Sequence, residues 1–190
     1  ETAAEFQSRE IGFVGQSPDN QLVTDKVWHE LAFGLESLGV DSDTIRRKTA
    51  EAAEFFGIQP IFEKNVSELS GGQKQLLNLA SVLVTKPSVV VLDEPTAQLD
   101  PIAASEFISM LVKINRELGI TVIITEHRLE EVIPVSSRLI AMEGGRIICD
   151  DVPRKAAELL KDGGMFVAMP APMRIWSALS DGGDCPLTVG

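Results

Sequence analysis

The sequence is poor in cysteine and contains no long apolar run. Its two cysteines, Cys149 and Cys185, lie far apart and lack a spacing typical of metal ligands. Free thiols in a cytosolic protein are therefore favoured over a disulfide framework or a zinc site. No signal peptide opens the chain, and no apolar run approaches the roughly 20 residues that a membrane-spanning helix needs. We therefore expect any membrane association to come through a partner.

Positive charge is also scarce. The 17 lysines and arginines are outnumbered by 28 aspartates and glutamates, which gives a formal net charge of −11 at pH 7. No basic run offers the phosphate contacts that release counterions from nucleic acids, so no nucleic-acid partner is expected. With 190 residues, 44% of them hydrophobic, the chain can bury a core and fits one domain.

Short apolar runs alternate with amphipathic segments along most of the chain. Apolar runs at 11–15, 89–92 and 120–125 predict strands, and the strand, helix, strand succession around 101–119 predicts an α/β fold with a parallel sheet. The remaining expected elements are two helices within 25–56, one helix at 70–86, a hairpin that turns at 143–145 and a short helix at 154–161. Beyond Asp162 glycine, proline and aspartate become dense, which predicts a tail or linker at 162–190 with little structure of its own.

Two short segments carry residues suited to phosphate chemistry. The apolar run 89–92 ends in Asp93 and Glu94, and a buried strand can deliver such acids to a phosphate site, although they can also be merely its polar end. Upstream, Ser70 and Gln73 fit a capping box that satisfies the first free amides of a helix. Gly71 and Gly72 inside this box would let a phosphate approach those amides at the positive end of the helix dipole.

In their order along the chain, these segments resemble the motifs of the ATPase domain of ABC transporters. The matching residues are Gln16, Leu69-Ser70-Gly71-Gly72-Gln73, Asp93-Glu94, Asp100 and His127. Residues 13–21 and 30–36 resemble the Q-loop region of the energy-coupling-factor branch, which drives uptake of vitamins or metal ions. The resemblance spans about residues 11–160. It implies a partial P-loop NTPase core with a parallel sheet and a helical signature subdomain at about 17–86, within an ATPase domain fragment at 1–161.

The resemblance also implies ligands and roles. ATP and Mg²⁺ are the expected ligands, with Asp93, usually through water, and Gln16 at the metal. Glu94 would polarise the attacking water and His127 would contact the γ-phosphate, which makes both catalytic. The residues expected to bind ATP are Gln16, Ser70, Gly71, Gly72, Gln73 and Asp100.

Several of these residues also have an ordinary structural interpretation. Asp100 before Pro101 is typical of a helix N-cap, and the cap and the family's D-loop role can coexist. A solitary histidine after a strand, such as His127, is often structural. The family more often has Ser-Ala-Leu-Asp where this chain has residues 97–100, so Gln98 departs from the family pattern. His29 is expected on a helix surface.

One family motif is missing from these 190 residues. No G-x-x-x-x-G-K-[S/T] is present, so the amide cradle, the phosphate lysine and the Mg²⁺-binding hydroxyl are absent, and the sequence contains no tyrosine that could stack on adenine. Because the chain begins at Glu1 and Gln16 is close to that end, we expect an N-terminal truncation, and we expect the isolated chain to be inactive.

The complete protein is expected to be the motor ATPase of an importer. The resemblance implies a head-to-tail dimer with a second ABC ATPase domain, a transmembrane coupling protein and a substrate-binding membrane subunit. It places the protein in the cytoplasm, peripheral on the inner face of the cell membrane. Segments 172–176 and 185–189 look similar to the linker of fused tandem ATPases, although an ordinary C-terminal tail is the alternative. A soluble non-transport ABC ATPase and a non-catalytic regulatory ABC module are the alternative functions.

Overall fold

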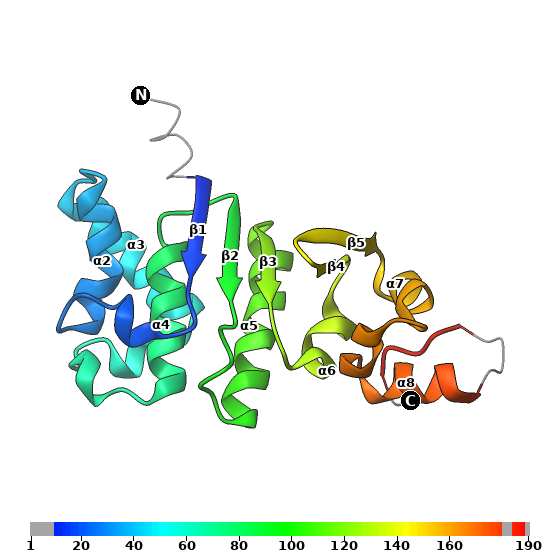
Figure 1. Ribbon diagram of the computed structural model, residues 1–190. Helices are drawn as coiled ribbons and strands as arrows, with labels where there is room; N and C mark the ends of the chain where they lie inside the picture. Colours follow the sequence, from blue (N-terminus) through cyan, green and yellow to red (C-terminus); the bar gives the residue numbers. More distant parts are fainter. Residues whose placement is uncertain (1–9, 180–183, 189–190) are drawn as a thin grey trace. The chain divides into compact units, whose positions relative to one another are not determined.

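The computed structural model describes residues 10–179 and 184–188, and the chain divides into two compact units. The first unit comprises Glu1–Glu126 and the second comprises His127–Gly190. Figure 1 shows a sheet with flanking helices in the first unit and a hairpin with short helices in the second. The predicted α/β class with a parallel sheet is confirmed.

The first unit is built on a three-stranded parallel sheet with the order β1-β2-β3. The strands are β1 (Ile11–Val14), β2 (Val89–Asp93) and β3 (Thr121–Thr125). Phe13, Val91 and Ile123 lie side by side across the sheet, and Asp93 lies beside Thr125 at its carboxyl end. This register brings the ends of all three strands to one edge, where ligands of open α/β sheets commonly bind.

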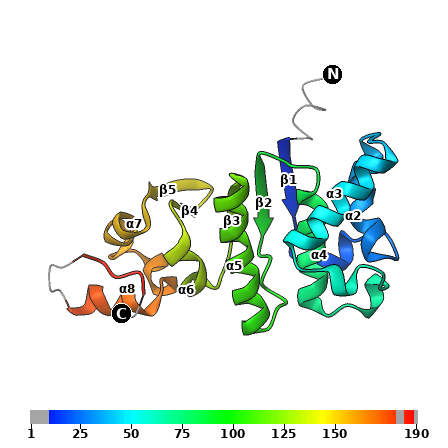
Figure 2. The ribbon, with the colours of Figure 1, turned by 180° about the vertical axis from the view of Figure 1, so that it is seen from behind.

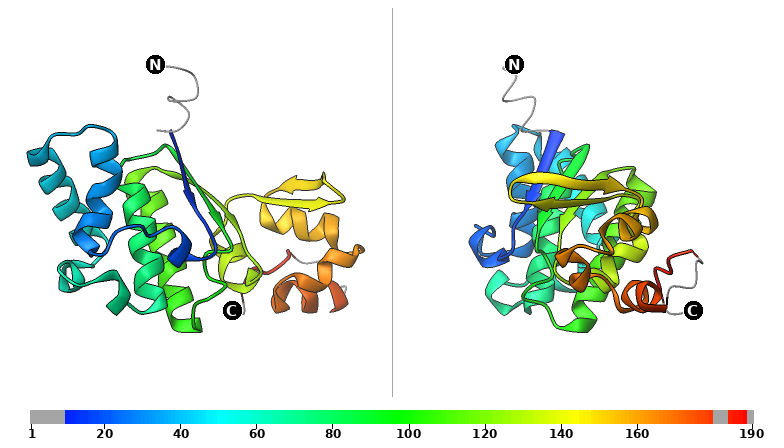
Figure 3. Two further views of the ribbon diagram at one scale, coloured as in Figure 1. Left: turned by 60° about the vertical axis from the view of Figure 1, so that its left-hand side comes forward. Right: turned by 45° about the vertical axis from the view of Figure 1, so that its right-hand side comes forward.

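Among the described residues, four helices accompany this sheet, together with short 3-10 turns. The helices are α2 (Val27–Ser37), α3 (Ser42–Phe55), α4 (Gly71–Leu83) and α5 (Pro101–Leu118), and the 3-10 turns are η1 (Pro18–Asn20), η2 (Gln59–Ile61) and η3 (Val66–Glu68). Helices α4 and α5 lie on one face of the sheet, as Figures 1 and 2 show from opposite sides. Helices α2 and α3 lie beyond α4, on its side away from the strands (Figure 3).

The helix ends follow the local signals in the sequence. The side chain of Asp41 accepts a hydrogen bond from Thr44 N at the start of α3, and Gly57 (φ 68°) follows its end. Helix α5 begins after Asp100 and ends at Gly119, whose φ of 69° is the left-handed conformation that glycine adopts at low cost. The N-cap at Asp100 was expected from the sequence.

The two faces of the sheet differ in burial. Val14, Val90 and Leu92 are fully buried beneath α4 and α5. On the opposite face Ile11, Phe13 and Ile123 are 52%, 54% and 51% exposed, and no described residue covers them. Parallel sheets are normally covered on both faces, because their crossover connections place helices on each side. The described residues therefore place helices on only one face of this sheet.

The second unit is a hairpin packed against short helices. Its elements are α6 (Leu129–Val132), η4 (Ile133–Val135), β4 (Leu139–Glu143), β5 (Arg146–Asp151), α7 (Pro153–Leu160), η5 (Gly164–Ala168) and α8 (Ala171–Leu179). Strands β4 and β5 pair antiparallel through Gly144 and Gly145, whose φ angles of 55° and 76° suit a tight two-residue turn. The predicted hairpin is therefore confirmed.

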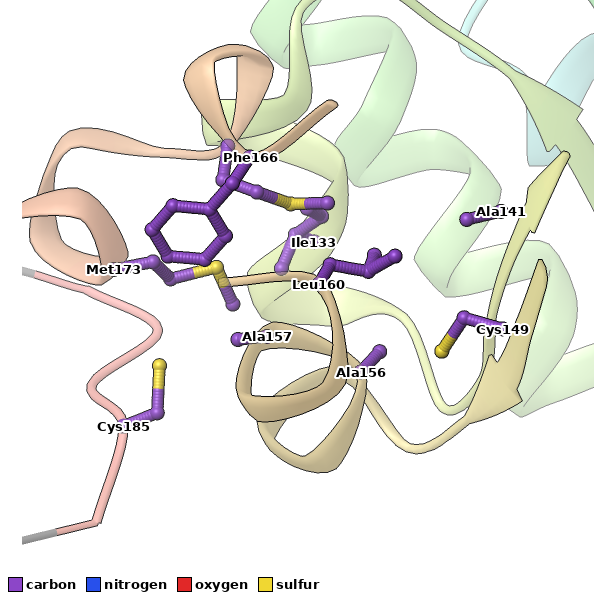
Figure 4. Close-up of a cluster of buried hydrophobic side chains, with 10 residues drawn as sticks. Ile133, Ala141, Cys149, Ala156, Ala157, Leu160, Phe166, Met173 and Cys185 are labelled. Atoms are coloured by element: carbon purple, nitrogen blue, oxygen red, sulfur yellow. The ribbon is translucent and has the colours of Figure 1, made fainter. Parts of the chain in front are cut away.

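The expectation of little structure beyond Asp162 is wrong for the described residues. Phe166, Met173 and Cys185 are buried in the hydrophobic cluster of the second unit, where Figure 4 shows them beside Ala157 of α7. The guanidinium of Arg154 donates a hydrogen bond to the carbonyl of Cys185. The apolar residues of this segment show no clear periodicity in the sequence, because they are held by contacts with residues distant in sequence. Residues 180–183 and 189–190 lie outside the described residues, and a linker role for 162–190 stays a prediction.

Candidate functional site

The two acids at the end of β2 are held by the neighbouring strand. Thr125 Oγ1 donates a hydrogen bond to Asp93 Oδ1 at 2.7 Å. The same hydroxyl accepts one from Glu94 N at 3.2 Å, and the carbonyl of Thr125 accepts another at 3.0 Å. One threonine on β3 therefore fixes both the carboxylate of Asp93 and the backbone of Glu94. The sequence prediction missed Thr125. Its position beside Asp93 in the sheet register is the feature that indicates its role.

Glu94 has an unusual backbone conformation. Its φ of 46° lies in the left-handed region, which is unfavourable for residues other than glycine and recurs at functional sites. Strand β2 ends at Asp93. The direction of the Glu94 side chain therefore follows from this turn and not from the alternation of side chains along β2.

The side chain of Glu94 contacts a residue far away in the sequence. Gln16 Nε2 donates a hydrogen bond to Glu94 Oε2 at 3.1 Å, across 78 positions of the chain. Gln16 follows β1, which pairs with β2, so the sheet itself brings the two side chains together. This bond leaves the amide oxygen of Gln16 as the part of the group that can contact a cation.

The turn after Glu94 is anchored by a second carboxylate. Thr96 is 1% exposed, and both its backbone N–H and its hydroxyl donate to Glu126 Oε1, at 2.9 and 2.7 Å. Glu126 was not among the predicted site residues. Because it follows β3, it holds the segment after β2 just as Thr125 holds the end of β2.

The start of α4 has the predicted capping box. Ser70 N donates to Gln73 Oε1 at 3.0 Å, and Gln73 N donates to Ser70 Oγ at 3.3 Å. Ser70 and Gly71 are exposed, and a Cβ added at Gly71 would meet no atom within 4 Å. A Cβ added at Gly72 would lie 3.1 Å from the Cβ of Ala103 on α5. The helix therefore presents an open N-terminus on the Gly71 side and packs closely on the Gly72 side.

Asp100 and His127 complete the set of predicted residues. Asp100 Oδ1 accepts hydrogen bonds from Ile102 N and Ala103 N, both at 3.0 Å, so the helix-cap prediction is confirmed. A D-loop role for Asp100 stays a prediction. His127 is exposed and is the first residue of the second unit, whereas the other predicted site residues belong to the first unit.

A small cavity lies where three of the predicted segments meet. Its volume is about 210 Å³. It is lined by Gln16, Pro18, Asp19, Gly71, Lys74, Gln75, Pro95, Gln98 and Leu99. Lys74 Nζ forms an ion pair with Asp19 Oδ1 at 2.6 Å across this region. The segment after β1, the start of α4 and the turn after β2 are therefore neighbours in space.

The donor atoms at the sheet edge suit a magnesium ion. Asp93 offers a carboxylate and Gln16 an amide oxygen, which are hard ligands that Mg²⁺ accepts alongside water and phosphate oxygens. No cluster of three or more His, Cys, Asp or Glu side chains suited to a metal occurs in the part of the chain that the structure describes. The protein ligands therefore fit a Mg²⁺ held mainly by water and a bound phosphate, but not an all-protein metal cage.

Comparison with known proteins agrees with this arrangement. A family model described as "ABC transporter" matches residues 1–97. The chain belongs to the ABC transporter family. The ATPase-domain resemblance inferred from the motifs is therefore confirmed.

The relatives of this ABC domain include proteins of different lengths. A putative ABC transporter ATP-binding protein of Bacillus cereus is 49% identical over 188 residues, which cover 97% of this chain and 33% of the relative. The energy-coupling factor transporter ATP-binding protein EcfA1 of Caldanaerobacter subterraneus is 42% identical over 159 residues, 82% of this chain and 57% of the relative. The chain thus spans about a third of the first relative and a little over half of the second.

A solved structure of similar fold is CbiO1 from Clostridium perfringens, described as part of the ABC transporter complex CbiONQ. It superposes with a TM-score of 0.75 at 34% sequence identity, over 86% of this chain and 68% of CbiO1. Among the described residues of this ABC domain, no helix is both long and apolar enough to span a bilayer.

Proposed function

We propose that this chain belongs to the ATP-hydrolysing motor subunit of an energy-coupling-factor-type importer. The observation that carries the proposal is the hydrogen bond from Gln16 to Glu94 at 3.1 Å, beside an Asp93 that Thr125 holds at 2.7 Å. An amide, a metal-binding carboxylate and a second carboxylate at one sheet edge are the groups that phosphoryl transfer to water requires from this part of the protein.

Glu94 is the residue proposed to orient the attacking water. Its side chain is fixed by Gln16, and its backbone N–H is fixed by Thr125. A carboxylate that is held by one hydrogen bond and carried by a fixed backbone can accept a hydrogen bond from water and polarise it without first reorganising. Asp93 and the amide oxygen of Gln16 would hold Mg²⁺, which supplies charge neutralisation to the phosphates when bound.

The start of α4 is proposed to serve a second ATP site. The exposed amides at Gly71 and the Ser70 hydroxyl lie at the positive end of a 13-residue helix, which favours a phosphate group. We propose that this phosphate belongs to nucleotide held by a second ABC ATPase domain, paired head to tail. Asp100 and Gln73 are proposed to bind ATP where the two ATPase domains meet, and His127 is proposed to contact the γ-phosphate.

The relatives support a role in transport. EcfA1 is named as an energy-coupling factor transporter subunit, and CbiO1 is described as part of a transporter complex. We therefore propose a transmembrane coupling protein and a substrate-binding membrane subunit as partners, with the ATPase peripheral on the cytoplasmic face. The B. cereus relative, of which this chain covers 33%, is long enough for a second ATPase domain, which supports a tandem parent.

Purification of the complete protein from its own cells tests this proposal. We expect it to hydrolyse Mg-ATP and to copurify with a transmembrane subunit after mild detergent extraction. Glu106→Gln on the exposed surface of α5 is a control that should retain wild-type turnover. A complete protein that hydrolyses ATP but associates with no membrane subunit would contradict the importer role and favour a soluble ABC ATPase.

A further inference from the structure

Hydrogen bonds from two directions converge on Gly15, the residue immediately before Gln16. Its N–H donates to Gln21 Oε1 at 2.5 Å, and its carbonyl accepts from Gln75 Nε2 at 3.3 Å. Strand β1 ends at Val14, so both backbone groups of Gly15 lie beyond the ladder that fixes the strand. Two glutamine side chains therefore set the orientation of the chain at the point where it enters Gln16.

Gln21 is itself held by α4. Asn78 Nδ2 donates to Gln21 Oε1 at 2.9 Å, so this oxygen accepts hydrogen bonds from both Asn78 and Gly15. The Gln21 amide also donates to Phe13 O at 3.4 Å, a longer contact. Asn78 and Gln75 are three residues apart on α4, which places them on one face of the helix. Both are buried, at 2% and 0% exposure.

The packing at this point leaves little room for another arrangement. A Cβ added at Gly15 would lie 3.2 Å from Gln21 Oε1 and 3.5 Å from the Phe13 ring. Gln75 Oε1 is buried without a hydrogen-bond partner among the described residues, which lowers stability. An apolar side chain would fill the site of Gln75 without this cost. The donor bond to Gly15 is therefore the physical feature that distinguishes glutamine at this position.

We propose that Gln21, Gln75 and Asn78 are positioning residues that align Gln16 with Glu94. They connect α4, the helix capped by Ser70, to the peptide that carries Gln16, and the side chain of Gln16 donates to Glu94. Loss of the network displaces the Gln16 amide and, through it, the carboxylate that orients water. This inference rests on the proposed ATPase function.

Substitutions at Gln21 separate hydrogen bonding from packing. Gln21→Glu retains an oxygen that accepts from Asn78 and Gly15, and it exchanges the 3.4 Å donor contact to Phe13 O for a carboxylate oxygen at a partly exposed position. Gln21→Met has similar size but replaces the amide oxygen by a thioether, which is only a weak acceptor. If Gln21 mattered only for packing, methionine would be the better replacement. We expect the opposite order, with glutamate functional and methionine impaired.

Gln75 should show the reverse preference, because it acts as a donor. Gln75→Glu loses the donor bond to the carbonyl of Gly15 and places a carboxylate at a fully buried position, whereas Gln21→Glu keeps both bonds that its oxygen accepts, so we expect Gln75→Glu to be the more impaired. Ser81→Ala is a matched control on the same helix, since its hydroxyl donates to the carbonyl of Asn78 and to no other described residue. Circular dichroism melting of each variant identifies any that fails to fold.

The first measurement uses the 190-residue chain without nucleotide. Nuclear magnetic resonance should show shifts of the Gly15 backbone amide and the Gln16 side-chain amide in Gln21→Met, with both signals near their wild-type positions in Gln21→Glu and Ser81→Ala. An unchanged Gln16 signal in folded Gln21→Met would overturn the proposal. This result does not depend on whether the parent protein hydrolyses ATP.

The second measurement uses the complete protein. We expect Gln21→Met to lower kcat by about tenfold or more while KM for Mg-ATP changes little, because the alignment of Glu94 is lost but nucleotide contacts are retained. Gln21→Glu should restore turnover to near the wild-type value. Equal turnover in the two variants would overturn the proposal, whereas a wild-type protein with no ATPase activity would overturn the proposed function alone.

Discussion

Gln16 Nε2 donates a hydrogen bond to Glu94 Oε2 at 3.1 Å, joining the segment after β1 to the segment after β2. This contact restricts the carboxylate that is proposed to orient water. It leaves the amide oxygen of Gln16 as the atom of that group that can contact a cation.

Glu94→Gln in the complete protein should therefore lower ATP turnover by roughly 100-fold or more, since a positioned general base typically contributes that much. ATP binding should be retained, and a nucleotide-bound dimer should accumulate. Steady-state turnover, equilibrium binding and size-exclusion chromatography measure these three effects. A loss of ATP affinity as large as the loss of turnover would contradict the role given to Glu94.

Thr125→Val should separate positioning from nucleotide binding. The substitution keeps the shape of the side chain but removes the hydroxyl that contacts Asp93 and Glu94 N. We expect turnover to fall by about tenfold through misplaced acids, with Mg-ATP affinity less affected. Thr121→Val, an exposed position on the same strand, is the control. Indistinguishable turnover in the two variants would show that the Thr125 hydroxyl is dispensable.

The isolated 190-residue chain should bind Mg-ATP poorly and hydrolyse none above background. Its sequence contains no G-x-x-x-x-G-K-[S/T], so the amide cradle and the phosphate lysine are missing from it. Isothermal titration calorimetry of the purified chain tests this directly. Micromolar affinity for ATP would show that these 190 residues suffice for binding.

The two cysteines should resist alkylation in the folded protein. Burial raises the pKa of the Cys149 thiol and also that of the Cys185 thiol, and only the thiolate reacts rapidly. At pH 8 we expect slow modification by iodoacetamide in buffer and rapid modification in urea, followed by mass spectrometry. Fast native labelling of Cys185 with slow labelling of Cys149 would show that the C-terminal segment detaches from the cluster in Figure 4.

The sequence predicted features that depend on neighbouring residues better than features that depend on contacts between residues far apart in the chain. The starts of α4 and α5 depend on Ser70 and Asp100 and on residues within one turn, so composition and spacing sufficed. The bond from Gln16 to Glu94 spans 78 positions, and only the family resemblance placed both residues at one site. Asn78 belongs to none of the motifs, and Gln21 was matched only as part of the segment 13–21, so neither was expected to position Gln16. The C-terminal segment was mispredicted since Met173 is ordered by a distant cluster and not by local periodicity.

The exposed start of α4 makes a prediction about assembly. If Ser70 and Gly71 contact phosphate held by a second ATPase domain, the 190-residue chain should associate with an intact partner only when ATP is present. Ser70→Arg should abolish this association, because a long side chain at the N-cap blocks the amides and removes the hydroxyl. Ser42→Arg at the exposed start of α3 makes the same change of charge at another helix and should associate normally. Analytical ultracentrifugation of each chain with a hydrolysis-deficient partner measures the effect. Equal ATP-dependent association of the two variants would mean that the start of α4 does not contact the partner's nucleotide.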